Sequence, residues 1–251
     1  MNINKAIKYQ ILEMKKSVIG YYGIIYAIYI LFAIFIGIYV SDGNNGSIGS
    51  IGGTEFSTAI FAFAIGLTSF KDTFKMFLQN GLSRRTLFKS FILSIMLLSI
   101  FMSLIDSVNT VIVNTISNYN PIYLQIYGRR YAEGVSEIVK LLDGFLWNTF
   151  IYLTVAMVGY FLAILYYRMD KRLTIIVSVG VPGLLFFVLP IIEFNFTKGA
   201  IIQTIGRFIS FASGFENGYN PYYSIMTSIF VFIIFGGLSY GLMKKAVVKP
   251  T

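Results

Sequence analysis

The sequence predicts an all-α polytopic membrane protein with six transmembrane helices. Only 12 % of the 251 residues are charged and 56 % are hydrophobic, whereas about 25 % of the residues of a soluble domain are charged. The apolar residues lie in runs of about 20 with few charges, which is the length that a helix needs to cross a bilayer. The chain has no cysteine and no histidine, which excludes disulfides, thiolate chemistry and metal sites built from these residues.

The apolar runs divide one transmembrane domain into spans. The expected spans are residues 18–40, 51–70, 86–108, 144–167, 173–192 and 222–243. If both termini are cytoplasmic, the inner segments hold 15 of the 20 lysines and arginines, as the positive-inside rule requires. We therefore expect a bacterial-type plasma membrane with both termini inside. The net charge of +9 is spread over span edges, so nucleic acid is not an expected partner.

Residues 1–17 carry an apolar face of their own. Isoleucine, methionine and valine recur at helical spacing at Ile3, Ile7, Ile11, Met14 and Val18. Lysines occupy much of the remaining surface, which is typical of a helix that lies in the membrane interface. We expect such a helix before the first span, and an ordinary basic flank is the alternative.

A basic segment, residues 71–89, separates the second and third spans. Its first half carries an apolar stripe formed by Phe70, Phe74, Phe77 and Leu78. Gly81 accepts the left-handed conformation that ends many helices, and Ser83 is a favourable N-cap. The pattern predicts a short amphipathic helix, a turn, and a new helix that starts near Arg84. The alternative is a plain positive anchor, which would not need a separate capped helix.

The third span has a polar face. Side chains at helical spacing along it are Ser99, Ser103, Asp106, Ser107, Thr110 and Asn114. Polar side chains within a span face the protein interior or a water-filled cavity. One interpretation is a translocation pathway lined by Ser103, Asp106, Thr110 and Asn114. The alternatives are hydrogen bonds between helices, or an Asp106 that already lies at the outer interface.

The fifth span contains Pro182 and Gly183 near its middle. Proline removes a backbone donor and disturbs the preceding turn, so this span is predicted to kink or break. The outer segment that follows, residues 193–221, has an amphipathic stretch at 198–212 that predicts an interfacial or re-entrant helix.

The other long outer segment, residues 117–143, has tyrosines at every fourth position. These are Tyr119, Tyr123, Tyr127 and Tyr131. Because tyrosine favours the headgroup level of a membrane, we expect these side chains to anchor the segment there. Contact with a substrate is the alternative.

No catalytic motif is present. The chain has no phosphate-binding loop, no nucleophile elbow and no zinc-protease signature. We therefore expect no catalytic residue, metal or cofactor in this chain.

The segment Phe-Leu-Gln-Asn-Gly-Leu-Ser-Arg-Arg-Thr-Leu-Phe-Lys, residues 77–89, resembles the coupling-helix region of small type-2 ABC exporter permeases. The basic helix at 3–16 is similar to their N-terminal elbow helix, and the kinked fifth span with amphipathic outer segments resembles their architecture. The segment at 117–143 departs from the family, in which it is often shorter.

The resemblance implies a permease subunit that pairs with a second permease chain and binds two copies of a separate ATPase, which holds ATP and Mg. It implies an ATPase-coupling surface within residues 71–85, with Gln79, Asn80, Leu82 and Arg84 nearest the ATPase. The residues of this surface are Phe74, Phe77, Leu78, Gln79, Asn80, Gly81, Leu82, Ser83, Arg84 and Arg85.

The expected function is export of amphipathic or hydrophobic cargo, such as peptides. A non-transporting membrane scaffold or receptor subunit is the alternative, and an intramembrane enzyme ranks last because the chain lacks catalytic groups.

Overall fold

The computed structural model describes residues 3–41, 52–114, 119–131 and 134–247, and every regular element in these ranges is helical. The α-helices are α1 (Ile3–Ser41), α2 (Thr54–Thr68), α3 (Lys71–Gln79), α4 (Arg84–Asn114), α5 (Ile122–Tyr127), α6 (Glu137–Arg168), α7 (Lys171–Gly183), α8 (Leu189–Ile192), α9 (Ala200–Ser213) and α10 (Pro221–Lys244). A 3₁₀ turn, η1 (Gly128–Arg130), follows α5. Two π-helical turns, η2 (Leu184–Val188) and η3 (Glu193–Thr197), follow α7 and α8.

Four helices in the described part of the chain are long and apolar enough to cross a membrane. They are Arg84–Asn114, Glu137–Arg168, Lys171–Thr197 and Pro221–Lys244. The expectation of an all-helical membrane protein is met at this level. Helix α2 has 15 residues and is about 22 Å long, which is shorter than the hydrocarbon core of about 30 Å. The full count of six spans stays a prediction.

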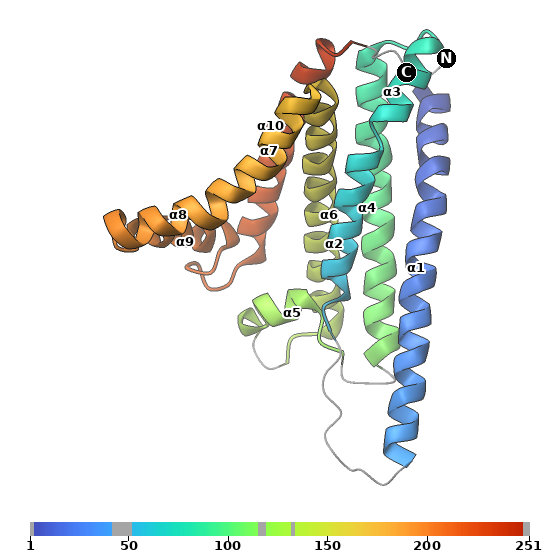
Figure 1. Cartoon of the computed structure of the whole chain (residues 1–251). Coiled ribbons are helices and arrows are strands. Elements are labelled where there is room, and N and C mark those ends of the chain that lie inside the picture. Colours follow the sequence, from blue (N-terminus) through green and yellow to red (C-terminus); the bar gives the residue numbers. More distant parts are fainter. Residues whose placement is uncertain (1–2, 42–51, 115–118, 132–133, 248–251) are drawn as a thin grey trace.

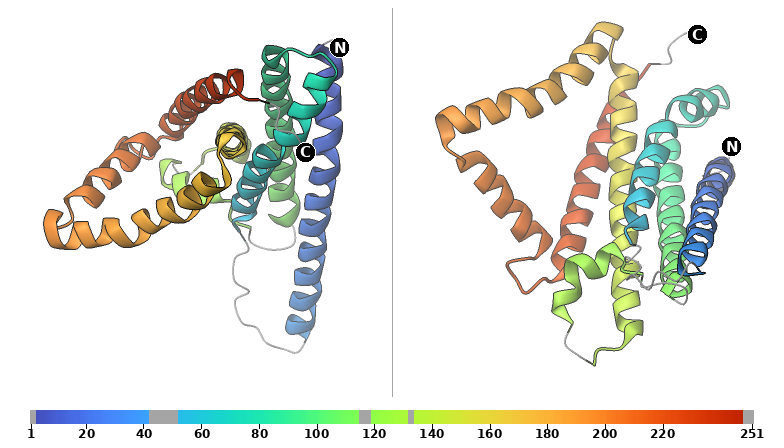
Figure 2. Two further views of the ribbon diagram at one scale, coloured as in Figure 1. Left: turned by 45° about the horizontal axis from the view of Figure 1, so that its top comes forward. Right: turned by 60° about the horizontal axis from the view of Figure 1, so that its bottom comes forward.

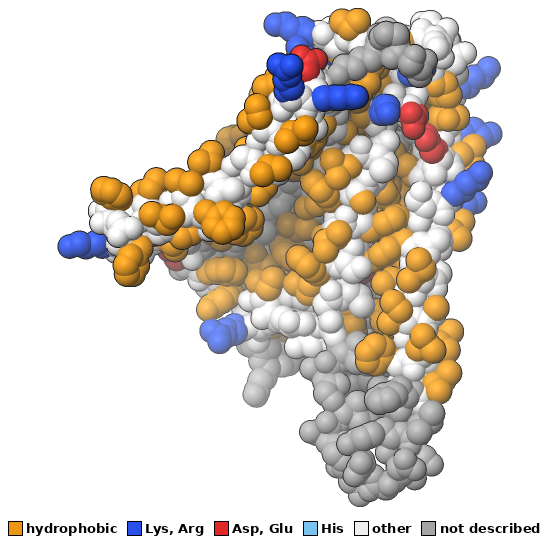
Figure 3. Space-filling model, in the orientation of Figure 1, with side chains coloured by type: hydrophobic (Ala, Val, Ile, Leu, Met, Phe, Trp, Pro, Cys, Tyr) orange, Lys and Arg blue, Asp and Glu red, His pale blue; other side chains and the backbone are white. Residues whose placement is uncertain are grey.

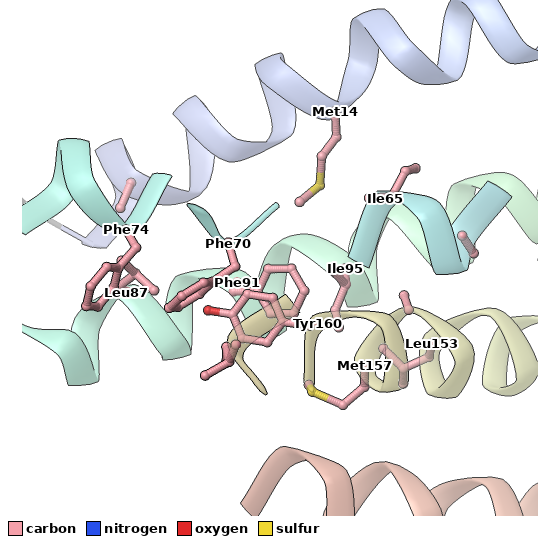
Figure 4. Close-up of a cluster of buried hydrophobic side chains, with 14 of the residues drawn as sticks. Met14, Ile65, Phe70, Phe74, Leu87, Phe91, Ile95, Leu153, Met157 and Tyr160 are labelled. Carbon is pink, nitrogen blue, oxygen red and sulfur yellow. The ribbon is translucent and has the colours of Figure 1, made fainter. Parts of the chain in front are cut away.

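Helices α1, α2, α4, α6 and α10 run side by side and form a bundle (Figures 1 and 2). Helix α6 is central, since it packs against α2, α4 and α10, while α1 packs against α4. The core is rich in aromatic rings: Phe91 of α4 stacks on Tyr160 of α6 with ring centroids 3.6 Å apart (Figure 4). The start of α1, the end of α10 and α3 lie at one end of the bundle (Figure 1), which we call the basic end.

Helices α2 and α6 approach each other through two glycines. A Cβ atom on Gly66 would lie 2.0 Å from the carbonyl oxygen of Ala156, and a Cβ on Gly159 would lie 2.3 Å from that of Phe63. Real Cβ atoms do not approach backbone oxygens so closely, so only glycine permits this packing. Small residues play the same role at many membrane helix contacts.

Helix α1 corrects the expectation of a separate N-terminal interfacial helix. It continues without a break from Ile3 to Ser41, about 58 Å at 1.5 Å per residue, because no proline or other helix-ending signal separates residues 1–17 from the first span. Its buried face, at every fourth residue, is Ala6, Gln10, Met14, Val18 and Tyr22. The isoleucines at positions 3, 7 and 11 are only half-buried, since the contact with α4 is rotated by about one residue from the expected face.

Residues 171–213 leave the bundle. The helix Lys171–Thr197 runs away from it, α9 returns, and α10 then packs along α6 (Figures 1 and 2). Of the predicted kink or break at Pro182 and Gly183, the break does not occur, because a π-helical turn at Leu184–Val188 keeps the chain helical after the proline. The kink stays a prediction. None of the most apolar stretch of this helix is buried within the chain. The helix predicted at 198–212 is present as α9.

The tyrosines of the outer segment are not headgroup anchors, which corrects that expectation. Tyr119, Tyr123 and Tyr127 are 6 %, 2 % and 1 % exposed. Helix α5 folds back against the start of α6, where the rings of Tyr123 and Tyr127 pack with Trp147 and Ile225. The Tyr119 hydroxyl is hydrogen-bonded to Thr54 of α2. These rings therefore pack inside the protein, whereas the sequence pattern places them at the headgroup level of the membrane.

The glycine contact between α2 and α6 predicts opposite effects for one substitution at two sites. Gly159→Ala should destabilise the chain by roughly 1–3 kcal/mol, because its methyl group overlaps the α2 backbone. Gly237→Ala in α10 meets nothing within 4 Å and should leave stability unchanged or raised, since alanine favours helix. Loss of helical circular dichroism during SDS titration would measure both, and equal stability of the two variants would contradict the packing.

Candidate functional site

Helix α3 is anchored at the basic end by its apolar stripe. Phe74 and Phe77 are fully buried. The Phe74 ring lies edge-on to Tyr167 of α6 with centroids 5.7 Å apart, and Phe77 lies edge-on to Tyr9 of α1 at 5.8 Å. The predicted amphipathic stripe therefore fixes α3 to two helices of the bundle.

The turn after α3 has the predicted stop and cap. Gly81 adopts a φ of 71°, in the left-handed region where a side chain is disfavoured. The Leu82 amide donates to the Phe77 carbonyl over 2.9 Å. The Ser83 hydroxyl accepts from the Thr86 amide over 3.1 Å, so it caps α4. The chain thus changes direction within Asn80–Ser83 and continues directly into α4.

The structure divides the predicted coupling residues into anchors and surface. Leu82 is 5 % exposed and packs in the core, so it does not face a partner as expected. Arg84 is half-buried, and its guanidinium donates to the Lys244 carbonyl at the end of α10. Phe74, Phe77 and Leu78 face the bundle. The exposed members are Gln79, Asn80, Gly81, Ser83 and Arg85.

Basic side chains lie near this exposed surface. Lysine and arginine side chains gather at the basic end and along the start of α1 (Figure 3). Lys71, Arg85 and Lys89 are exposed beside the α3 turn. The described part of the chain thus presents an exposed polar turn with basic residues near it at the basic end.

A buried carboxylate, Asp106 of α4, joins three helices. It is 4 % exposed and accepts hydrogen bonds from Tyr22 of α1 at 3.0 Å and from Tyr152 of α6 at 2.6 Å. One turn further along α4, Asn109 accepts from Tyr26 over 2.8 Å. Sequence reasoning missed these tyrosines, although Tyr22, Tyr26 and Tyr29 recur at helical spacing in the first span.

The predicted pathway residues separate into two groups. Ser103 donates to the Phe145 carbonyl over 2.7 Å and, with Asp106, makes contacts between helices. Thr110 and Asn114 instead line a cavity of ≈ 270 Å³ at the end of the bundle opposite α3. The alternative of interhelical hydrogen bonding therefore describes Ser103 and Asp106, while Thr110 and Asn114 line the cavity. The translocation pathway stays a prediction.

The cavity lies among α2, α4, α5 and α6. Its polar lining is Glu55, Ser107, Thr110, Asn114, Tyr123, Glu137, Lys140 and Asn148, and its apolar lining includes Val111, Leu124, Leu141 and Phe145. Lys140 and Glu137 form an ion pair with a 2.7 Å separation. Sequence reasoning did not identify Glu55 or Asn148, because the two residues meet only through the packing of α2 on α6.

Asp143 connects two segments at the end of the bundle opposite α3. It accepts hydrogen bonds from Tyr131 at 2.7 Å and from Tyr222 of α10 at 3.0 Å. Burial, with the nearby Asp143 carboxylate, raises the pKa of Tyr131 to about 12, so this hydroxyl keeps its proton at neutral pH and remains a donor. The outer segment is thereby attached to the start of α10.

Among the described residues, no group of three or more acids lies close enough together to hold a metal ion. No family model matches the chain, and no curated protein or solved structure matches it. The function is therefore argued from the geometry above.

The Asp106 cluster predicts a stability difference between two tyrosine variants. Tyr152→Phe removes a buried hydrogen bond to a carboxylate, which should cost roughly 1–3 kcal/mol. Tyr223→Phe alters a ring on α10 that is 38 % exposed and should change stability by no more than about 0.5 kcal/mol. Thermal unfolding in nanodiscs would compare them, and a Tyr152→Phe protein as stable as the parent would refute the assigned role.

Proposed function

We propose that this chain is the membrane-spanning permease subunit of an ATP-driven ABC exporter and that a separate ATPase docks on the α3 turn. The observation that carries the proposal is the form of that turn. A short helix buries Phe74 and Phe77 fully, is followed by a left-handed glycine, and presents polar atoms at the basic end. A topological anchor needs charge only, whereas a coupling element needs a rigid shape that a partner can push.

The contacts of α3 support a mechanical role. Its rings touch α1 and α6, its turn continues directly into α4, and Arg84 reaches the end of α10. A displacement of the turn would therefore be passed to four helices of the bundle at once. Coupling of this kind needs two conformations that the ATPase binds with different affinity.

The remaining parts of the proposal follow the resemblance of residues 77–89. The permease has six spans, with α1 and α2 added to the four long apolar helices, and both termini lie in the cytoplasm of a bacterial-type cell. Two ATPase copies with ATP and Mg serve two permease chains. The cargo is amphipathic or hydrophobic, with peptides as the leading class.

A cysteine placed on the turn tests the docking surface. The chain has no cysteine, so each variant carries one thiol. Gln79→Cys, with a short bifunctional crosslinker, should capture an ATPase of the host when the cells are crosslinked before lysis. Gln203→Cys on the exposed face of α9 is the matched control and should capture none. Capture of no ATPase by either variant, with the chain purifying alone, would favour the scaffold alternative.

Gly81→Pro tests the transmission of force. Proline cannot adopt the positive φ of Gly81, so this variant should insert in the membrane yet lose most of the ATP hydrolysis that cargo stimulates. Full stimulated hydrolysis by Gly81→Pro would overturn the coupling role of the turn.

A further inference from the structure

Two buried hydrogen-bonding residues, an acid and an amide, line the cavity at the end of the bundle opposite α3. Glu55, in the first turn of α2, and Asn148 of α6 both line it and are 3 % and 5 % exposed. The Oδ1 atom of Asn148 has no hydrogen-bond partner. Glu55 accepts from the Ile122 amide at 3.5 Å and from the Tyr119 hydroxyl, which leaves acceptor capacity on its carboxylate. A buried amide oxygen without a partner is costly, so this lining is suited to a ligand that brings donors.

The charged residues that line the cavity indicate which sign of charge the ligand should carry. The titratable groups in the lining are Glu55, Glu137, Lys140 and Tyr123. Lys140 and Glu137 pair with each other at 2.7 Å, so their charges cancel. Glu55 is left as the acid with no cation beside it in this lining, which favours a cation over an anion.

The apolar lining and the size limit the rest of the ligand. The apolar wall of the cavity is formed by Val111, Leu124, Leu141 and Phe145. A volume of ≈ 270 Å³ lies just below the range of about 300–1,000 Å³ for pockets that hold whole drug-sized ligands. The cavity therefore fits a head group with a short apolar chain, or one side chain of a larger molecule.

The geometry points to a binding site for the primary ammonium group of an amphipathic amine, with Glu55 as the charged acceptor and Asn148 as the neutral one. An alkylammonium ion offers three N–H donors and one positive charge, and its hydrocarbon chain matches the apolar wall. Binding at this site needs no ATPase, so the proposal can be tested independently of the transport function.

The protein contains its own reporter for this site. Trp147 is the only tryptophan of the chain and precedes Asn148. Its ring lies 5.9 Å from that of Tyr123, which lines the cavity. Occupancy of the cavity should therefore change the fluorescence of Trp147.

The test is a titration of the full chain in phosphatidylcholine nanodiscs with n-octylammonium, followed by Trp147 emission. We expect a saturable change, with binding of octanol, octanoate and octyltrimethylammonium at least about tenfold weaker, because each lacks the charge, the donors or both. Trp147→Phe gives the signal that partition into lipid alone produces. A response that rises without saturation, or that octanol reproduces at equal concentration, overturns the site.

Two variants assign the roles of the acceptors. Glu55→Gln should weaken octylammonium binding by about tenfold or more and remove the preference over octanol. Asn148→Leu should also weaken it, and this variant should fold, because it replaces an unpaired buried oxygen with an apolar group of similar size. Glu216→Gln, which changes an exposed acid outside the cavity, is the control. Unchanged octylammonium binding in Asn148→Leu or in Glu55→Gln overturns the proposal.

Discussion

A polar group inside an apolar bundle is costly unless it finds a partner within the protein, because hydrocarbon offers none. Asp106 shows how this constraint organises the fold. Its two oxygens are satisfied by hydroxyls from α1 and α6, so the rotation of both helices about α4 is fixed by one carboxylate. Ser94 of α4 donates to Gln10 of α1 in the same way near the basic end. Much of the register between α1 and α4 depends on these contacts.

The same bundle holds α3 in place. Its rings and its turn are attached to helices that Asp106 and the glycine contact of α2 and α6 hold together. The helical hairpin of residues 171–213 has no comparable attachment along α7. The chain thus combines a tightly packed half, which can transmit a displacement, with a half whose apolar surface is open to lipid or to another chain.

Local features of the fold could be predicted from the sequence because they depend on neighbouring residues. The left-handed turn at Gly81 and the Ser83 cap need only the residues beside them, and both are present. The helix at Ala200–Ser213 and the long helices α4, α6 and α10 follow from the spacing and length of apolar runs, although α6 begins at Glu137, before the expected start of its span at residue 144. The pattern could not decide whether Leu82 and the tyrosines near α5 face lipid, a partner or the core, because each environment accepts an apolar ring or chain.

By itself, the sequence determined that this chain is helical and apolar enough for a membrane, and where its short basic helix stops. The tertiary structure decided which faces those helices bury. A hydropathy pattern is the same whether an apolar side chain faces lipid or packs inside the protein. It therefore cannot distinguish a buried tyrosine from one that anchors the chain at the membrane surface. Nor can it show that α1 is one continuous helix. Only the packing of α2 on α6 brings Glu55 and Asn148 to one cavity, because these residues lie far apart in the chain and no local pattern connects them.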